Sequence, residues 1–360
     1  VDGEAVLTVA GLLEGVRIPV TGGSGMKEFP ALPELWEPGL PRLYKASVSC
    51  LGDRVEDVAG FRDIRAEGDR ILLNGKDIFL KGISVHEESL AGGRTLTEEE
   101  VRENLMLVKE LGGNFLRLAH YPHHPRTARM ADEMGILLWE EIPVYWAIDF
   151  ENPDTLDDAK NQLTELIVRD RNRASVIIWS VGNENEDTPR RYAFMESLVR
   201  TARALDPTRL VSAACLVNWE ENSVNDSLSA VLDVVGINEY FGWYMPGIEK
   251  IPALFEGARG LNKPFIISET GAGALAGRHG EENEFFTEEK QRKVYEDQIE
   301  KIRAISNIRG MTPWILYDFR TPLRTNSFQR GYNRKGLLSE DKKKRKQAFF
   351  TLKEFYRGLE

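Results

Sequence analysis

Cysteine is scarce in this sequence, because Cys50 and Cys215 are the only two among 360 residues. They lie far apart, and neither has a second cysteine or a histidine at the short spacing that is typical of a metal site. The sequence therefore predicts neither a disulfide framework nor a zinc site.

Long apolar runs and long basic runs are missing as well. No stretch approaches the roughly 20 apolar residues that cross a membrane, so a membrane partner is not expected. The net charge is −10, and we interpret the longest basic run, Lys342–Lys346, as the solvated start of a helix and not as a nucleic-acid surface. No charged-then-apolar leader opens the sequence, which favours a cytoplasmic location.

The sequence does contain enough apolar residues, 42%, for one large packed domain and one smaller domain. Residues 1–72 alternate apolar and polar side chains, as in Ala5–Val9 and Tyr44–Val48, between turns rich in Gly and Pro. This pattern predicts a small, partial immunoglobulin-like β-sandwich. Asn74-Gly75 is a signal for a tight hairpin, and we place the second domain at residues 73–360.

Strands that alternate with helices are expected in this second domain. Eight short apolar segments are the predicted strands: 78–85, 113–119, 136–142, 176–182, 210–215, 231–238, 264–268 and 310–316. Amphipathic patterns predict helices at 97–111, 126–134, 157–171, 189–204, 287–305 and 345–358. Such units indicate an α/β fold, a (β/α)8 TIM barrel. An open doubly wound sheet is the rival, but Gly82–Val85 is not the Gly-rich turn expected after its first strand.

Two glutamates, Glu184 and Glu269, each close an apolar and β-branched run. Runs of this kind are typical of strands buried on both faces, and the carboxyl ends of barrel strands are where barrel enzymes keep their chemistry. Two carboxyl groups across such a mouth can act as proton donor and nucleophile in glycoside hydrolysis. The structural alternative is a pair of surface acids at strand ends.

Several motifs stand in the order of a known family. They are Trp36–Pro38 with Pro41–Tyr44, Leu80–Ile83 with His86-Glu87, Asn114–Arg117 with His120–Pro122, Trp139–Pro143, Asn183-Glu184 and Ser268-Glu269. With these motifs the chain resembles glycoside hydrolase family two, which includes β-galactosidases and β-glucuronidases. The jelly-roll domain that usually precedes the sandwich in that family has no counterpart in this sequence.

The resemblance implies roles for five residues. Glu184 would be the general acid/base and Glu269 the nucleophile, so their surroundings should move the two pKa values apart. Asn183 would hold the 2-hydroxyl of the sugar, and Arg117 would keep Glu269 ionised. Tyr240 would donate a hydrogen bond to the nucleophile. The structural alternatives are a purely structural ion pair for Arg117 and an ordinary rim tyrosine for Tyr240.

Further polar and aromatic residues at predicted strand ends could contact the sugar through hydrogen bonds or ring stacking. These substrate-binding candidates are His86, His120, Glu141, Asn238, Tyr244 and Trp314. For the two histidines and Trp314 the alternative is an ordinary structural role. His86 and Glu141 raise the question of a divalent ion, but the sequence offers no full ligand set. We therefore predict no metal and no cofactor.

Substrate choice depends on Asn333 and Lys335, a pair that we call the clamp. Their Asn-x-Lys spacing is similar to the element with which β-glucuronidases of the family hold the sugar carboxylate, and an ammonium and an amide suit that group. The alternative is a solvated turn. The stretch Trp314–Arg320 and the nearby Arg324 depart from the usual Trp-Asn-Phe-Ala-Asp-Phe and add cations, which would suit another uronic acid such as galacturonate.

The leading hypothesis is a retaining exo-β-glycosidase that hydrolyses β-glucuronides through a covalent glycosyl-enzyme intermediate. A β-galactosidase or β-galacturonidase is the alternative within the family, and a catalytically silent carbohydrate-binding barrel is the alternative of another class. A carbohydrate is the expected partner, and a homo-oligomer is compatible with the sequence. For a retaining enzyme the two carboxyl groups should lie about 5 to 5.5 Å apart.

Overall fold

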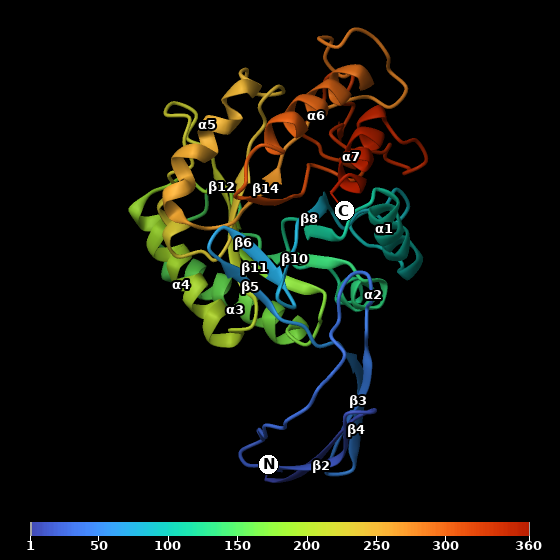
Figure 1. Ribbon diagram of the computed structural model, residues 1–360, viewed down its shortest axis with the longest axis vertical. Coiled ribbons are helices and arrows are strands. Elements are labelled where there is room, and N and C mark those ends of the chain that lie inside the picture. The colour runs from blue at the N-terminus through green and yellow to red at the C-terminus, as the bar shows by residue number, and fades with distance from the viewer. Residues whose placement is uncertain (1, 360) are drawn as a thin grey trace.

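A closed barrel of eight parallel strands forms the centre of the computed structural model, which describes residues 2–359 without the side chain of residue 259 (Figure 1). The strands follow the chain around the barrel, and the last pairs with the first. They are β8 (Leu80–Val85), β9 (Phe115–Leu118), β10 (Leu137–Glu141), β11 (Val176–Asn183), β12 (Leu210–Leu216), β13 (Val235–Asn238), β14 (Phe265–Glu269) and β15 (Ile308–Met311). The predicted TIM barrel is confirmed.

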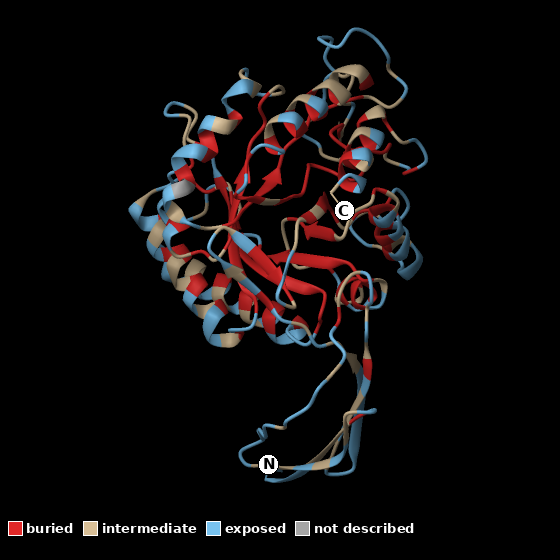
Figure 2. Cartoon of the chain, viewed as in Figure 1, coloured by how far each residue is buried: buried red, intermediate tan, exposed pale blue. Residues whose placement is uncertain are grey.

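The barrel strands are apolar because both of their faces are covered. All eight residues of β11 are buried, and so are all five of β10, as the red strands in Figure 2 show. One set of side chains packs inside the barrel, where Phe115, Trp139 and Ile266 meet, and the other packs against the outer helices. Chemistry is thereby confined to the carboxyl ends of the strands, where polar side chains emerge.

Helices surround the barrel. They are α1 (Glu98–Glu110), α2 (Arg126–Met134), α3 (Pro153–Asp170), α4 (Pro189–Leu205), α5 (Ile251–Glu256), α6 (Glu288–Ile302) and α7 (Gln347–Arg357), with short 3-10 turns at Ser227–Ala230, Ile248–Lys250 and Gly257–Leu261. Thr97 and Glu100 form the expected capping box of α1. Helix α3 begins four residues before its predicted start, because Asn152 caps a polar first turn that carries no apolar period.

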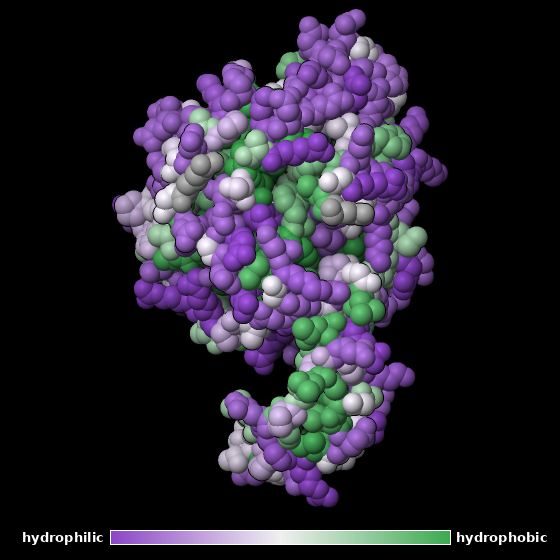
Figure 3. Space-filling model, viewed as in Figure 1, coloured by the Kyte–Doolittle hydropathy of each residue, from purple (hydrophilic) through white to green (hydrophobic). Residues whose placement is uncertain are grey.

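The N-terminal part contains two antiparallel sheets. The first pairs β2 (Leu13–Val20), β1 (Gly3–Val9), β3 (Tyr44–Cys50) and β4 (Asp53–Ala59), and the second pairs β5 (Ile64–Glu67), β6 (Arg70–Leu73) and β7 (Lys76–Asp77). They are consistent with a small sandwich domain. The second sheet packs on the end of the barrel opposite the mouth through Ile64 and Ile71. Hydrophobic side chains gather on the visible face of the first sheet, where Val48 and Val55 are exposed (Figure 3).

The hairpin signal at Asn74-Gly75 is confirmed, because both residues have positive φ, 53° and 78°, between β6 and β7. The predicted domain boundary between residues 72 and 73 falls within this hairpin and stays a prediction.

The basic run Lys342–Lys346 is not the solvated segment that its charge indicates. Lys342 and Lys346 are buried, and Lys346 stands at the start of α7 without exposed surface. Their partners Glu103 and Asp318 come from distant parts of the chain. The prediction of a solvated run is therefore wrong for these two lysines, because acids from distant elements, the exposed Glu103 and the buried Asp318, compensate their charge.

Candidate active site

A cleft of about 730 Å³ opens at the carboxyl ends of the barrel strands. Nine of the predicted site residues line it, namely His86, His120, Glu184, Tyr240, Tyr244, Glu269, Trp314, Asn333 and Lys335. The remaining four, Arg117, Glu141, Asn183 and Asn238, lie buried beneath it and are joined to it by hydrogen bonds. The structure thus brings all of the predicted residues to one end of the barrel.

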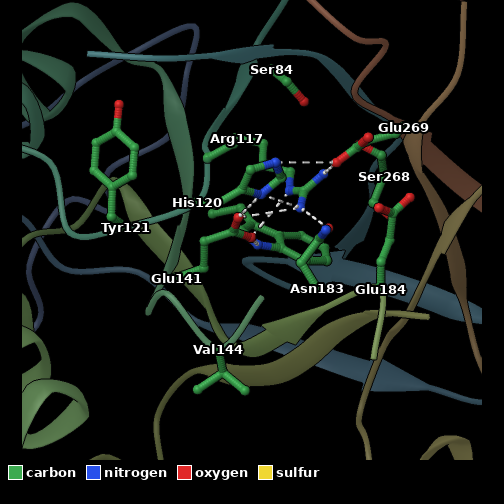
Figure 4. A network of polar contacts seen from close by, with 12 residues as sticks. Ser84, Arg117, His120, Tyr121, Glu141, Val144, Asn183, Glu184, Ser268 and Glu269 are labelled. Carbon is green, nitrogen blue, oxygen red and sulfur yellow. Dashed lines mark hydrogen bonds and ion pairs between the residues drawn. The ribbon is translucent and has the colours of Figure 1, made fainter. Parts of the chain in front are cut away.

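Glu269 is the last residue of β14 and has a strong donor at each carboxylate oxygen. Arg117 Nη1 donates to Oε1 over 2.9 Å, and the Tyr240 hydroxyl donates to Oε2 over 2.7 Å. His120 Nε2 lies 3.6 Å from Oε1. Figure 4 shows Arg117 and His120 beside Glu269. A cation and a phenol thus each donate to one oxygen of this carboxylate.

Arg117 lies fully buried at the centre of the network in Figure 4. Its Nε and Nη2 donate to both oxygens of Glu141 over 3.1 and 3.2 Å, and its guanidinium stands 5.5 Å from the ring of Trp139. Burial alone would lower the pKa of Arg117, but the charges of Glu141 and Glu269 raise it above its ordinary value. Two carboxylates therefore compensate this buried cation.

Glu184 follows β11 with a left-handed backbone, at φ 53°, which turns its side chain into the same cleft as Glu269. Its carboxyl accepts from Trp146 Nε1 over 2.7 Å and from Asn238 Nδ2 over 3.0 Å. Both donors are neutral. Burial and the negative charge of Glu269 raise the pKa of Glu184, and the two hydrogen bonds offset only part of this rise. The surroundings of Glu184 thus favour its protonated form.

Asn183 is oriented by its neighbours. Its Oδ1 accepts from Arg117 Nη2 over 2.7 Å and from Asn238 Nδ2 over 3.1 Å. Both of these groups can only donate, so they fix which end of the amide is Oδ1. The other end, Nδ2, is buried and has no hydrogen-bond partner in the described part of the chain. A buried donor without a partner costs free energy unless a ligand accepts from it.

One wall of the cleft is aromatic. The rings of Trp314 and His120 stack with centroids 4.9 Å apart and an interplanar angle of 12°, and His86 meets Trp314 edge-on at 5.1 Å. Burial lowers the pKa of His86 well below its ordinary value, so its imidazole is neutral. His86 Nδ1 lies 3.2 Å from the hydroxyl of Tyr121, and not against Glu141. Trp314 lines the cleft but is only 5% exposed, because His120, His86 and Phe319 pack around its ring.

The clamp lies beside this aromatic wall, because Ile315 N, next to Trp314, donates to Lys335 O over 3.3 Å and Asn333 pairs with Phe319. Asn333 and Lys335 are 7% and 5% exposed, so the alternative of a solvated turn is wrong. The Lys335 ammonium contacts the hydroxyl of Tyr244 and lies 5.0 Å from the ring of Tyr240. Arg324 Nη2 donates to the same Tyr244 hydroxyl over 3.1 Å. Burial would raise the pKa of Tyr244, but the two cations lower it below its ordinary value.

Sequence reasoning did not single out Trp146, Tyr145 or Phe319, which also line the cleft. Trp146 lies in a loop after β10, at φ 56°, and bonds Glu184. The only signal was its position, a few residues beyond a predicted strand end. Among residues 2–359 no cluster of three or more His, Cys, Asp or Glu could hold a metal ion, and none of the helices found there is long and apolar enough to span a membrane.

Comparison with models of protein families shows to which family this barrel belongs. The model described as "Glycosyl hydrolases family 2, TIM barrel domain" matches residues 64–360. The chain belongs to glycosyl hydrolase family 2. This family 2 chain is 33% identical to a β-glucuronidase of Streptococcus agalactiae over 86% of this chain and 56% of that protein. The chain therefore spans about half the length of such curated relatives.

Two solved structures share the fold of this family 2 chain over nearly its whole length. A β-galacturonidase of Eisenbergiella tayi bound to galacturonate is 29% identical with a TM-score of 0.90, over 100% of this chain and 67% of that one. A β-glucuronidase of Bifidobacterium dentium complexed with coumarin-3-O-glucuronide is 26% identical with a TM-score of 0.90, over 99% and 60%.

Proposed function

We propose that this family 2 chain is a retaining exo-β-glycosidase that hydrolyses β-glucuronides. The observation that carries the proposal is that Glu184 and Glu269 line one cleft but accept hydrogen bonds from different kinds of donor. Glu269 accepts a charge-assisted hydrogen bond from Arg117, whereas Glu184 accepts only from neutral donors. Glu269 is thereby suited to act as the nucleophile and Glu184 to deliver a proton.

The reaction would proceed in two steps. In the first, a carboxylate oxygen of Glu269 bonds to the anomeric carbon while the glycosidic bond breaks, and Glu184 gives its proton to the departing oxygen. In the second, Glu184 takes a proton from a water molecule, whose oxygen attacks the anomeric carbon and releases Glu269. Asn183 Nδ2, which is free of partners within the described residues, would donate to the 2-hydroxyl throughout.

An acidic sugar is favoured by the positive charge at the clamp. Lys335 and Arg324 converge on one phenol oxygen, and neither forms an ion pair with an Asp or Glu among residues 2–359. A carboxylate at C6 of the sugar would neutralise part of this charge, with Asn333 beside it as a directional partner. The curated relatives named β-glucuronidases agree with this choice.

A β-galacturonide is the second candidate substrate. The observation in its favour is Arg324, which adds a guanidinium beside the clamp and lines the cleft. A second cation gives the carboxylate of an epimeric uronic acid another place to bind. The β-galacturonidase of Eisenbergiella tayi is among the structures most similar to this chain.

The test compares initial rates on chromogenic β-glucuronide, β-galacturonide and β-galactoside substrates. We expect a uronide to exceed the galactoside about 10- to 100-fold in kcat/KM, the range of a charge-assisted hydrogen bond. Glu184→Gln and Glu269→Gln should each abolish turnover while the sugar still binds. Wild-type binding of a uronide without turnover would contradict the proposal and favour a silent carbohydrate-binding barrel.

A further inference from the structure

The backbone that carries the clamp has little regular structure of its own. Strand β17 (Tyr332–Asn333) has two residues and pairs only with β16 (Phe319–Arg320). Asn333 and Lys335 reach the cleft from alternate positions, while the intervening Arg334 extends toward Asp318. Backbone hydrogen bonds from Ala274 N to Arg334 O and from Ile315 N to Lys335 O also hold this segment, and Arg334 is the point at which a side chain from outside the cleft joins them.

Lys346 binds the backbone oxygen of Arg334 through its ammonium. Its side chain is fully buried and is not among the residues that line the cleft. The ammonium donates to Arg334 O over 3.1 Å, to Ala274 O over 2.6 Å and to Asp318 Oδ1 over 2.7 Å. All three of its hydrogen-bond donors are used, so the ammonium fixes three segments of chain relative to one another.

Asp318 closes the arrangement. Its second oxygen, Oδ2, accepts from Arg334 Nη1 over 3.2 Å, and Arg334 Nη1 also lies 2.7 Å from Glu340 Oε2. Arg334 is therefore bound both through its backbone oxygen and through its guanidinium. Gly336 passes so close that an added Cβ would meet Asp318 N at 2.2 Å.

Stability alone does not account for a fully buried Lys–Asp pair. Removing two charges from water costs several kcal/mol per ion, and apolar replacements of such pairs are often neutral or stabilising. Lys346 and Asp318 both have no exposed side-chain surface. What this pair supplies instead is a defined position for the peptide between Asn333 and Lys335.

We propose that Lys346, paired with Asp318, is a positioning residue that sets the clamp for an acidic sugar. It contacts no substrate and acts through the backbone of Arg334. The inference rests on the proposed uronide activity and extends it to a residue outside the cleft. An irregular segment carries the clamp, and the buried pair provides the rigidity that such a segment lacks.

Lys346→Met tests this inference through kinetics. We expect KM for the β-glucuronide to rise about tenfold or more with kcat nearly unchanged, because carboxylate binding is lost equally in the ground state and the transition state. Binding of free glucuronate, measured by calorimetry, should weaken by a similar factor. Lys343→Met is the matched control, because Lys343 is exposed three positions away, and its KM should stay at the wild-type value.

A double variant, Asp318→Asn with Lys346→Met, separates positioning from folding. It leaves no uncompensated buried carboxylate, so its thermal unfolding should lie near that of the wild type while its KM stays raised. Recovery of wild-type KM and glucuronate affinity in the double variant would overturn the inference. If the wild type cleaves uronides and Lys346→Met has an unchanged KM, only this inference is overturned. If the wild type neither cleaves nor binds uronates, the proposed function is overturned as well.

Discussion

Two donors divide the oxygens of Glu269 between them. Arg117 supplies charge at Oε1, and Tyr240 supplies a neutral hydrogen bond at Oε2. Tyr240 is 8% exposed, and its pKa is raised well above its ordinary value by burial and by Glu269, so it remains a donor. A fixed donor at Oε2 limits rotation of the carboxylate, and Arg117 supplies the opposite charge at Oε1.

We expect Tyr240→Phe to lower kcat about 10- to 100-fold, because a positioned donor beside the reacting carboxylate is lost. KM should change less. Steady-state kinetics on the β-glucuronide measures both values. Tyr192→Phe is the control, since Tyr192 lies outside the cleft. An unchanged kcat in Tyr240→Phe would contradict a role for this hydrogen bond.

Trp146 offers a test through pH. Its indole N–H stabilises the charged form of Glu184 and so lowers the pKa of that carboxyl. Trp146→Phe removes the donor, so the pKa of Glu184 should rise and the protonated acid should persist to higher pH. The basic limb of kcat/KM against pH should therefore move to higher pH.

Trp219→Phe, which alters an indole outside the cleft, should leave that limb in place. A shift of the basic limb of Trp146→Phe to lower pH would contradict the assignment of Glu184 as the proton donor.

Residues of this site differ in how far the sequence predicts them. Glu184 directly follows an apolar strand and Glu269 ends one, so one pattern predicts both their place and their direction. Trp146 and Lys346 have partners 38 and 28 positions away in the chain. No local pattern predicts such pairs, because the fold alone brings them together.

Secondary-structure elements are predictable here because a barrel strand is covered on both faces. β11 and β14 lie within two residues of their predicted ranges. Polar helix starts and short turns carry no such signal, so the first turn of α3, the short helix α5 and the 3-10 turns escaped prediction. A buried face produces a periodic pattern of apolar residues that can be recognised in the sequence. A helix cap or a short turn involves only a few residues and produces no such period.

Gly336 follows Lys335 in the chain and packs against the backbone of Tyr317 and Asp318. An added Cβ would come within 2.2 Å of Asp318 N and 2.4 Å of Tyr317 C, both backbone atoms that cannot yield cheaply. We expect Gly336→Ala to displace the clamp and to raise KM for the β-glucuronide at least about tenfold, the scale of a lost charge-assisted contact.

Gly257→Ala is the control for this change, because nothing lies within 4 Å of its added Cβ. Equal KM values for the two variants, measured with the glucuronide, would contradict the close approach at Gly336.

At the scale of the whole molecule, Trp36 joins the N-terminal part to the barrel. It is fully buried, packs with Ile64 and Ile71, and donates from Nε1 to Asp132 O over 2.8 Å. Trp36→Ala should lower the free energy of unfolding by about 3–5 kcal/mol through the cavity that it leaves.

KM should stay unchanged in Trp36→Ala, because this contact lies at the end of the barrel opposite the cleft. Thermal and denaturant unfolding measure the loss, with Leu32→Ala, an exposed residue of the same segment, as the control. A stability equal to that of the control would contradict this role of Trp36.

The most direct test of the central claim is to trap the intermediate. A 2-deoxy-2-fluoro-β-glucuronosyl substrate with a good leaving group slows the second step, so the sugar should remain on the enzyme as an ester. Mass spectrometry of a digest should find the label on Glu269, and Glu269→Gln should not be labelled. A label on another residue, or turnover that inverts the anomeric centre without any label, would contradict the account.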